Sequence, residues 1–228
     1  MKKGFTLAEV LITLAIIGVV ATLTMPNLIG NYQNRVLMTQ LQKTLNTVQN
    51  AAMKYMEETT SDSFTEITKT STGRKDFLKN YLDSVNICTP DTGYNNCLSA
   101  TYSSFDKANT TDVVDVMEST TGYPCCATLT SGATVCLAGT HIGSSVREIF
   151  IDDNGVKAPN VSGKDVFYTG VHSTGKMYYN RENGDYDTHD NGTLEQEANG
   201  DFCTTSQSNP KDAICLPYII SHGWEFKF

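Results

Sequence analysis

The first thirty residues constrain the fold of this chain more than any other segment. A short basic start, Met1 to Gly4, runs directly into an apolar segment from Phe5 to Met25, whose only ionisable residue is Glu9. About 21 residues at ~1.5 Å rise can span the ~30 Å hydrocarbon core of a bilayer. Lys2 and Lys3 precede this segment, which predicts that its N-terminal end stays in the cytoplasm.

An ordinary secretory signal peptide is the alternative interpretation. It requires an apolar core of about 7–15 residues with a small-x-small cleavage site behind it. Here the apolar run is longer and is followed by Met25-Pro26-Asn27-Leu28, while the small residue, Gly4, lies in front of it. The pattern therefore favours a membrane helix over a signal peptide that is removed behind its apolar core.

The motif at the junction is Lys-Gly-Phe-Thr-Leu-Ala-Glu-Val-Leu, from Lys3 to Leu11. It closely resembles the class III leader of type IV pilins and type II secretion pseudopilins. The resemblance implies that a prepilin peptidase in the membrane cuts between Gly4 and Phe5 and methylates the new amine of Phe5. It also implies that Glu9 is the signature acid of the family and Pro26 its usual helix kink.

Glu9 is the predicted assembly residue. A charge at the centre of a bilayer costs about 2.5–3.5 kcal/mol, and less nearer the surface. Glu9 lies one helical turn from Phe5, so its carboxylate can compensate the new amine of its own subunit or of a neighbour. Either pairing makes Glu9 an assembly residue and not a catalyst. The alternative is a glutamate that is merely tolerated near the headgroups.

From Asn27 to about Glu58 the chain is predicted to remain helical. Apolar residues recur there at helical spacing on one face, between mostly polar positions. The stripe comprises Leu28, Tyr32, Val36, Leu41, Leu45, Val48, Ala52 and Met56. Pro26 removes a backbone hydrogen bond and Gly30 adds flexibility, so a kink is predicted at this junction. The expected organisation is a leader at 1–4, a helix at 5–58 with 5–25 in the membrane, and a globular domain at 59–228.

The globular part is predicted to consist mainly of short strands. Residues 59–72 are rich in Thr and Ser and are predicted to be a linker or surface loop. The segment from Arg74 to Val85 predicts a short helix. Apolar runs and turn residues predict strands at 133–137, 147–151, 165–171 and 176–180, and a terminal hairpin from 215–221 and 224–228. The predicted fold class is α+β and pilin-like, with a long N-terminal helix packed on an antiparallel sheet.

Seven cysteines lie outside the apolar segment: Cys88, Cys97, Cys125, Cys126, Cys136, Cys203 and Cys215. Exported cysteines usually pair in an oxidising compartment. Proximity along the chain suggests Cys88–Cys97, Cys203–Cys215, and Cys136 with either Cys125 or Cys126, which leaves one thiol over. The loop between Cys203 and Cys215 resembles the disulfide-bounded loop near the end of many pilins. A zinc site is not expected, because no paired Cys-x-x-Cys arrangement is present.

Two oxygen-rich segments are candidate calcium sites. The first holds Asp152, Asp153, Asn154, Asn160 and Asp165. The second holds Glu182, Asp185, Asp187, Asp190, Asn191, Glu195 and Glu197. Calcium takes about 6–8 oxygen ligands from flexible loops. The second segment faintly resembles an EF-hand loop, but His189 stands at its third position and Ala198 at its twelfth, where a bidentate Glu is needed. The favoured interpretation is solvated acidic loops without a cofactor.

Charge and motif content argue against enzymes and nucleic-acid binders. The chain has 25 acidic and 17 basic residues, and its formal charge of −8 becomes −10 once Lys2 and Lys3 leave with the leader. Such an acidic domain repels phosphate backbones, so nucleic-acid partners are not expected. The four histidines are scattered, and neither a nucleophile elbow nor a phosphate loop occurs. Neither catalysis nor a small-molecule substrate is therefore expected.

The expected function is that of a filament subunit. By resemblance, the precursor sits in the inner membrane as a single-pass protein, and an assembly platform extracts it to join other pilins in a filament in the periplasm or on the cell surface. Three roles stay open: a type IV pilus subunit, a pseudopilin of a type II secretion piston, and a minor tip subunit acting as adhesin or in DNA uptake. A domain of about 170 residues favours a pilin or minor subunit over a minimal pseudopilin.

Overall fold

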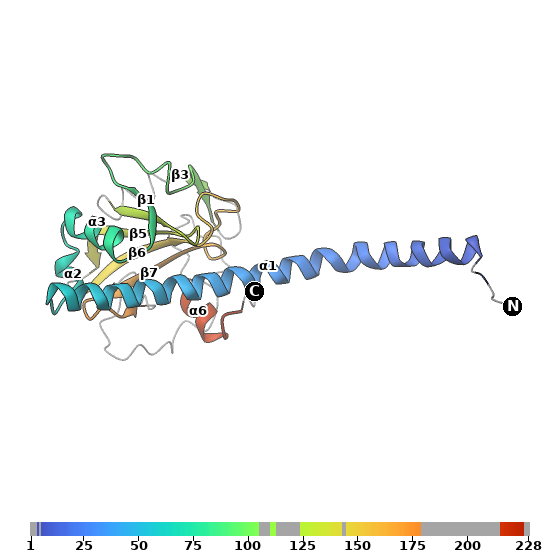
Figure 1. The fold of residues 1–228 in the computed structure, drawn as a ribbon, viewed down its shortest axis with the longest axis horizontal. Coiled ribbons are helices and arrows are strands. Elements are labelled where there is room, and N and C mark those ends of the chain that lie inside the picture. The colour runs from blue at the N-terminus through green and yellow to red at the C-terminus, as the bar shows by residue number, and fades with distance from the viewer. Residues whose placement is uncertain are drawn as a thin grey trace. The chain divides into compact units, whose positions relative to one another are not determined.

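The computed structural model describes residues 4, 6–104, 110–112, 124–142, 145–178 and 215–225. Its elements are α1 (Leu7–Thr59), α2 (Phe64–Ile67), α3 (Ser71–Asn80), β1 (Ser84–Cys88), β2 (Thr101–Ser103), β3 (Thr110–Asp112), β4 (Cys125–Leu129), β5 (Thr134–Ile142), β6 (Val146–Asp152), β7 (Val166–His172), β8 (Met177–Tyr178) and α6 (Leu216–Ser221). Figure 1 shows this arrangement. The chain divides into two compact units, Met1–Val36 and Leu37–Phe228.

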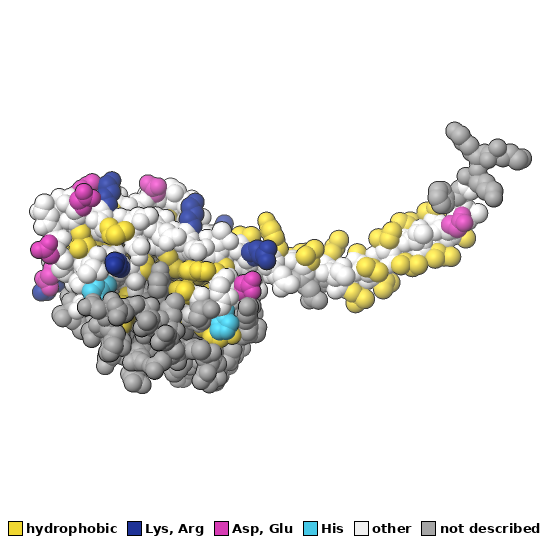
Figure 2. Space-filling view, turned by 90° about the horizontal axis from the view of Figure 1, so that it is seen from below, with side chains coloured by type: hydrophobic (Ala, Val, Ile, Leu, Met, Phe, Trp, Pro, Cys, Tyr) yellow, Lys and Arg dark blue, Asp and Glu magenta, His cyan; other side chains and the backbone are white. Residues whose placement is uncertain are grey.

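The first unit consists mainly of the N-terminal part of α1. Helix α1 is 53 residues long and is helical throughout, including at Pro26 and Gly30. Its large apolar side chains face outward on every side, with Leu7 79%, Ile17 63% and Leu23 71% exposed. Figure 2 shows hydrophobic side chains lining this part of the helix. Within the described residues this helix is long and apolar enough to cross a membrane, and so large an apolar surface calls for lipid or protein cover.

The second unit packs the C-terminal part of α1 on an antiparallel sheet. Six strands pair in the order β1-β4-β5-β6-β7-β8, and β2 and β3 form a separate two-stranded sheet. One stripe of α1 is buried against the larger sheet: Met38, Leu41, Leu45, Val48, Ala52 and Tyr55. Figure 1 shows the C-terminal part of this helix running along the sheet. The α+β prediction is confirmed, and so are the central strand predictions, with β5 extending further than expected to Ile142.

Two apolar layers cover the two faces of the sheet. In β4, Cys125, Ala127 and Leu129 join the core beneath the helices, whereas Cys126 joins a second cluster on the opposite face. This alternation follows from the two-residue period of a strand. The second cluster is completed by aromatic and aliphatic residues from the segment after β1 and from β2, namely Tyr94, Leu98 and Tyr102. Both faces of the central strands are therefore buried.

The linker predicted at residues 59–72 is wrong, because most of its length is structured and partly buried. Ser63 caps the short helix α2 through its side chain, and Phe64 is fully buried. The Phe64 ring meets Phe77 of α3 edge to face, with centroids 5.1 Å apart. The predicted helix at 74–85 begins earlier, at Ser71, and ends at Asn80. One large aromatic residue among hydroxyl side chains was the signal that this segment packs inward.

A buried arginine ties α2 to the sheet. Arg147 of β6 is fully buried. It donates to the Thr65 carbonyl at 2.9 Å, to Thr68 Oγ1 at 3.1 Å and to the Ala138 carbonyl at 3.1 Å. Burial lowers the pKa of Arg147 to about 10, with the nearby Arg74 charge adding to the effect. The guanidinium is still protonated at neutral pH, so it donates to the Thr65 carbonyl and the Thr68 hydroxyl of the α2 segment and to the Ala138 carbonyl of β5.

The predicted terminal hairpin is also wrong in its first half. Residues 216–221 form α6, in which the Ile219 amide donates to the Cys215 carbonyl at 3.0 Å. Two consecutive isoleucines favoured a strand, but burial of Leu216 and Ile219 in the helix-side core outweighs that preference. Pro217 is compatible with a first helical turn. Trp224 and Glu225 belong to no strand, and residues 226–228 lie outside the described residues.

The contact between α2 and α3 yields a stability prediction. A Cβ on Gly73 would overlap with the Ile67 carbonyl oxygen. Overpacking of this kind typically costs about 1–3 kcal/mol, so we expect Gly73→Ala to lower the free energy of unfolding by that amount. Gly30→Ala is the matched control, because a Cβ on Gly30 meets nothing within 4 Å. Denaturant unfolding of the detergent-solubilised chain measures both variants, and equal effects of the two would contradict the packing described.

Candidate processing and assembly site

The predicted processing site lies where the ordered helix begins. Gly4 is exposed, Phe5 lies outside the described residues, and α1 starts at Leu7. Gly4 is therefore an accessible glycine shortly before the start of a helix. Cleavage between Gly4 and Phe5 and methylation of Phe5 stay predictions, because the fold does not test them.

Glu9 is held by Thr6 at the first turn of α1. The Thr6 amide and the Thr6 hydroxyl both donate to Glu9 Oε2 at 2.8 Å, and the Glu9 amide donates back to Thr6 Oγ1 at 3.3 Å. This reciprocal arrangement is a capping box, which satisfies helix amides that have no partner within the helix. The Thr-x-x-Glu spacing was its sequence signal, and sequence reasoning missed it. The box directs the carboxylate to the backbone next to Phe5, where the new amine is predicted.

Pro26 and Gly30 were the predicted kink positions. The helix assignment continues through both residues, and a Cβ on Gly30 would contact no atom within 4 Å. Gly30 is therefore not required for a close approach of another segment within the chain. The kink itself stays a prediction.

The first predicted calcium segment forms one tight loop between β6 and β7. Asp165 accepts hydrogen bonds from the amides of Asn160 at 2.8 Å and Val161 at 2.7 Å, and from Asn154 Nδ2 at 3.0 Å. Gly155 has a φ of +65°, and a Cβ there would lie 2.6 Å from the Gly132 carbonyl oxygen, so this position requires glycine. The side chains of this loop thus hold its own backbone in place.

Asp152 ends β6, directly before this loop, and its side chain faces the second cluster. Its carboxylate accepts the Tyr102 hydroxyl at 2.7 Å, and both side chains are almost fully buried. Burial raises the pKa of Asp152 well above its ordinary value. Burial and the Asp152 charge likewise raise the pKa of the Tyr102 hydroxyl. This pair anchors β2 to β6 by one buried hydrogen bond.

Asp153 faces the opposite side and contacts α1. Gln40 Nε2 donates to the Asp153 carbonyl at 2.6 Å, and Thr44 Oγ1 lies 3.4 Å from Asp153 Oδ1. Burial raises the pKa of Asp153 to about 7, and the Asp165 charge adds to this rise. Gln49 makes a similar bridge, since its Oε1 accepts the Met177 amide at 2.9 Å. These polar residues of α1 therefore form hydrogen bonds to a loop and a strand. The helical pattern of the sequence placed them on the polar side of the helix and did not predict these contacts.

The loop therefore brings Asp152, Asn154 and Asp165 together. Both Asp165 oxygens and Asp152 Oδ2 accept hydrogen bonds, whereas Asp152 Oδ1 and Asn154 Oδ1 are buried and meet no hydrogen-bond donor in the described part of the chain. In the described part of the chain, no group of three or more His, Cys, Asp or Glu side chains is arranged to hold a metal ion. The second candidate set, which includes Asp185, Asp187 and Asp190, lies outside the described residues. The favoured interpretation of a solvated acidic loop is wrong for the first segment, because Asp152, Asp153 and Asp165 are buried. Calcium binding itself is untested at both segments.

Two disulfides agree with the pairings predicted from proximity along the chain. Cys88–Cys97 and Cys126–Cys136 are disulfides, which decides the open choice in favour of Cys126. Cys125 is a free, buried thiol on the helix side of β4. Cys215 is also disulfide-bonded, and its predicted partner Cys203 lies outside the described residues.

The buried Asp153 carboxyl predicts an unusual pH dependence. Its pKa rises from 3.8 to about 7 on folding, so between about pH 4 and 7 the folded state binds more protons than the unfolded state. This carboxyl therefore contributes most stability at the acid end, and its contribution falls as the pH rises to 7, by at most about 1.4 kcal/mol per pH unit. Asp153→Asn mimics the protonated form. We expect its gain in unfolding free energy over the parent chain to grow from pH 4 to 7 and then level off. A difference independent of pH would contradict a buried, titrating Asp153.

Comparison with known proteins identifies the N-terminal segment. Residues 1–25 match the family model described as the prokaryotic N-terminal methylation motif. No curated protein and no solved structure matches the chain. The match covers Gly4, Phe5 and Glu9 together with the first turns of α1. The chain thus carries the prepilin-type signal of type IV pilins and pseudopilins, joined to an α+β domain of pilin-like architecture.

Proposed function

We propose that this chain is a structural subunit of a type IV pilus-like filament. The methylation motif over residues 1–25 carries this proposal, because it marks a pilin-like or pseudopilin subunit in general. In the proposed pathway a prepilin peptidase cuts between Gly4 and Phe5 and methylates Phe5. An inner-membrane assembly platform then extracts the subunit into a filament with copies of itself or other pilins.

The exposed apolar surface of α1 fits two successive surroundings of the same helix, first the membrane and then the filament. Its N-terminal part is apolar on every side, and no residue of its most apolar stretch is buried within the chain. In the precursor, lipid covers this surface, and Lys2 and Lys3 keep the start of the chain in the cytoplasm. In the filament, helices of neighbouring subunits replace the lipid. The globular unit has its own core and is free to face solvent.

Glu9 carries the assembly step in this proposal. Its carboxylate already points to the backbone at Thr6, one residue from the amine that cleavage at Gly4 creates. In an apolar surrounding, a paired amine and carboxylate cost far less than either charge alone. An incoming subunit that pairs its Phe5 amine with Glu9 of a neighbour also fixes the stagger between the two helices.

The pseudopilin and tip-subunit roles share this N-terminal chemistry. The size of the globular unit favours a pilus or minor subunit over a minimal pseudopilin, and the net negative charge disfavours DNA uptake. We propose no catalytic role, since the motif is that of a structural subunit. Surface fibres on cells support the pilus role, whereas loss of secretion on deletion of the protein supports the piston.

Two substitutions of Glu9 separate charge pairing from helix capping. Glu9→Gln keeps a side chain that can accept in the capping box but removes the charge, whereas Glu9→Val removes both. We expect both variants to be cleaved normally and both to lose most filament yield, because the missing charge leaves the neighbour's amine unpaired. Filaments sheared from cells and quantified by immunoblot measure the yield.

Thr6→Val is the matched control, since it weakens the capping box and leaves the Glu9 charge in place. We expect it to retain most of the filament yield. Wild-type yield from Glu9→Gln with loss in Thr6→Val would assign Glu9 to capping alone and contradict its proposed role in assembly.

A further inference from the structure

Three cysteines form a row across neighbouring strands of the sheet. Cys88 of β1 stands directly opposite Cys126 of β4, and Cys126 stands directly opposite Cys136 of β5. All three, together with Cys97, belong to the second buried cluster, on the face away from α1. Residues opposed in an antiparallel pair point to the same face. The sulfurs of two disulfides therefore share one buried layer.

The register permits a disulfide that the native pairing does not use. Opposed Cα atoms in an antiparallel sheet lie about 4.5–5.5 Å apart, and disulfides bridge Cα separations of about 4.4–6.8 Å. The Cα atoms of Cys88 and Cys97 are 6.2 Å apart. The Cα separation expected between Cys88 and Cys126 thus lies within the range that a disulfide can bridge. The Cα separation between Cys88 and its native partner Cys97 lies within the same range.

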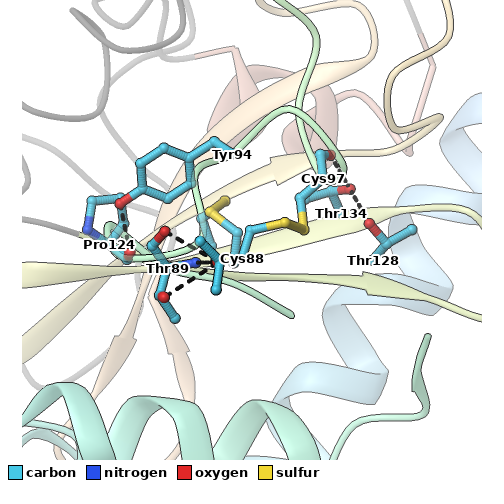
Figure 3. Close-up of a disulfide and its surroundings, with 10 residues drawn as sticks. Cys88, Thr89, Tyr94, Cys97, Pro124, Thr128 and Thr134 are labelled. Carbon is cyan, nitrogen blue, oxygen red and sulfur yellow. Dashed lines mark hydrogen bonds between the residues drawn. A yellow bond between two sulfur atoms is a disulfide. The ribbon is translucent and has the colours of Figure 1, made fainter. Parts of the chain in front are cut away.

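The native partner of Cys88 sits in a segment that can open locally. The loop from Cys88 to Cys97 is exposed at residues 90–93 and 95–96, while Tyr94 anchors it by donating to the Pro124 carbonyl at 2.9 Å (Figure 3). Cys126 and Cys136, in contrast, lie on central strands. Because most of this loop is exposed, we expect it to open before the sheet does and to admit a small thiol to the Cys88–Cys97 bond. Opening must break the Tyr94 hydrogen bond and the one from the Thr134 hydroxyl to the Cys97 carbonyl, which is 2.7 Å long.

We propose that Cys88 and Cys126 form an alternative, exchangeable disulfide when the Cys88–Cys97 bond is reduced. A small-thiol thiolate attacks Cys97 Sγ and forms a mixed disulfide, and Cys88 leaves as a thiolate. A second small-thiol thiolate attacks the sulfur of the first small thiol in that mixed disulfide, which frees Cys97 as a thiolate and releases the two small thiols as their disulfide. The Cys88 thiolate attacks Cys126 Sγ, the new Cys88–Cys126 bond forms, and Cys136 leaves as a thiolate and takes up a proton. This last step is an isomerisation without net oxidation.

The exchange has a structural consequence. It frees the 88–97 loop from its disulfide while β1, an edge strand, becomes covalently tied to β4. When a reducing environment breaks the Cys88–Cys97 disulfide, β1 thereby stays linked to β4 by the Cys88–Cys126 disulfide. Cys125 does not join the row, because its Sγ points to the helix side and lies 3.5 Å from Ser71 Oγ.

Paired cysteine variants of the full chain test the geometry. In Cys97→Ser/Cys136→Ser, the native partners of Cys88 and Cys126 are both absent. We expect non-reducing peptide mapping after alkylation to show the Cys88–Cys126 disulfide, with Cys125 alkylated as the internal control. Alkylation of both Cys88 and Cys126 in a chain with the parent circular dichroism spectrum would overturn the proposal.

Partial reduction of the parent chain tests the exchange without any substitution. The membrane-extracted protein is titrated with reduced glutathione, quenched with an alkylating agent and mapped. We expect species in which Cys97 and Cys136 are alkylated while Cys88 is linked to Cys126. Alkylation of Cys88 and Cys97 as a pair, with Cys126–Cys136 intact at every glutathione concentration, would overturn the exchange even if the double variant can form the bond.

Discussion

An apolar helix surface that the chain itself does not cover is the constraint on which the rest of this structure depends. From Leu7 to Met25 the large side chains of α1 are exposed on all sides, and water is a poor solvent for such a surface. From Met38 on, the buried apolar residues of the same helix form one stripe that the sheet covers. Leu28, Tyr32 and Val36, which were predicted to belong to that stripe, are exposed. One continuous helix therefore serves two different surroundings, and the change in its pattern divides the molecule into two units.

Hydrogen bonds, in addition to apolar contacts, join the second part of α1 to the sheet. Polar residues of the helix reach the β6–β7 loop and β8, through Gln40 to the Asp153 carbonyl and through Gln49 to the Met177 amide. The loop in turn is braced by its own Asp165. On the far face, two disulfides and the side chains of Tyr94, Leu98 and Tyr102 cover the sheet within the described part of the chain. Both layers are needed to bury strands that are apolar on both faces.

Periodicity and motif chemistry predicted the parts that depend on local pattern. The long helix, the α+β class, the pairing Cys88–Cys97 and the leader motif around Gly4 all follow from spacing or from a short motif. Spacing left Cys125 and Cys126 open as partners of Cys136, and the strand register decides for Cys126. The prediction failed where distant contacts decide. Phe64 turns a Thr-rich segment into a packed helix because Phe77 is there to meet it, and Ile219 enters a helix because the core lies beneath it. The Thr6–Glu9 capping box could have been predicted from its Thr-x-x-Glu pattern. Glu9 was instead interpreted only as a charge in the membrane segment, and its place in the first helical turn was overlooked.

The central claim is that this helix becomes a filament helix after cleavage in front of Phe5. The most direct measurement is the mass of the N-terminal peptide of the protein isolated from membranes of its native cell. The account predicts a peptide that begins at N-methylated Phe5. A peptide that begins at Met1 would leave an unprocessed membrane anchor, and one that begins well beyond Met25 would indicate an ordinary secreted protein; either would contradict the account.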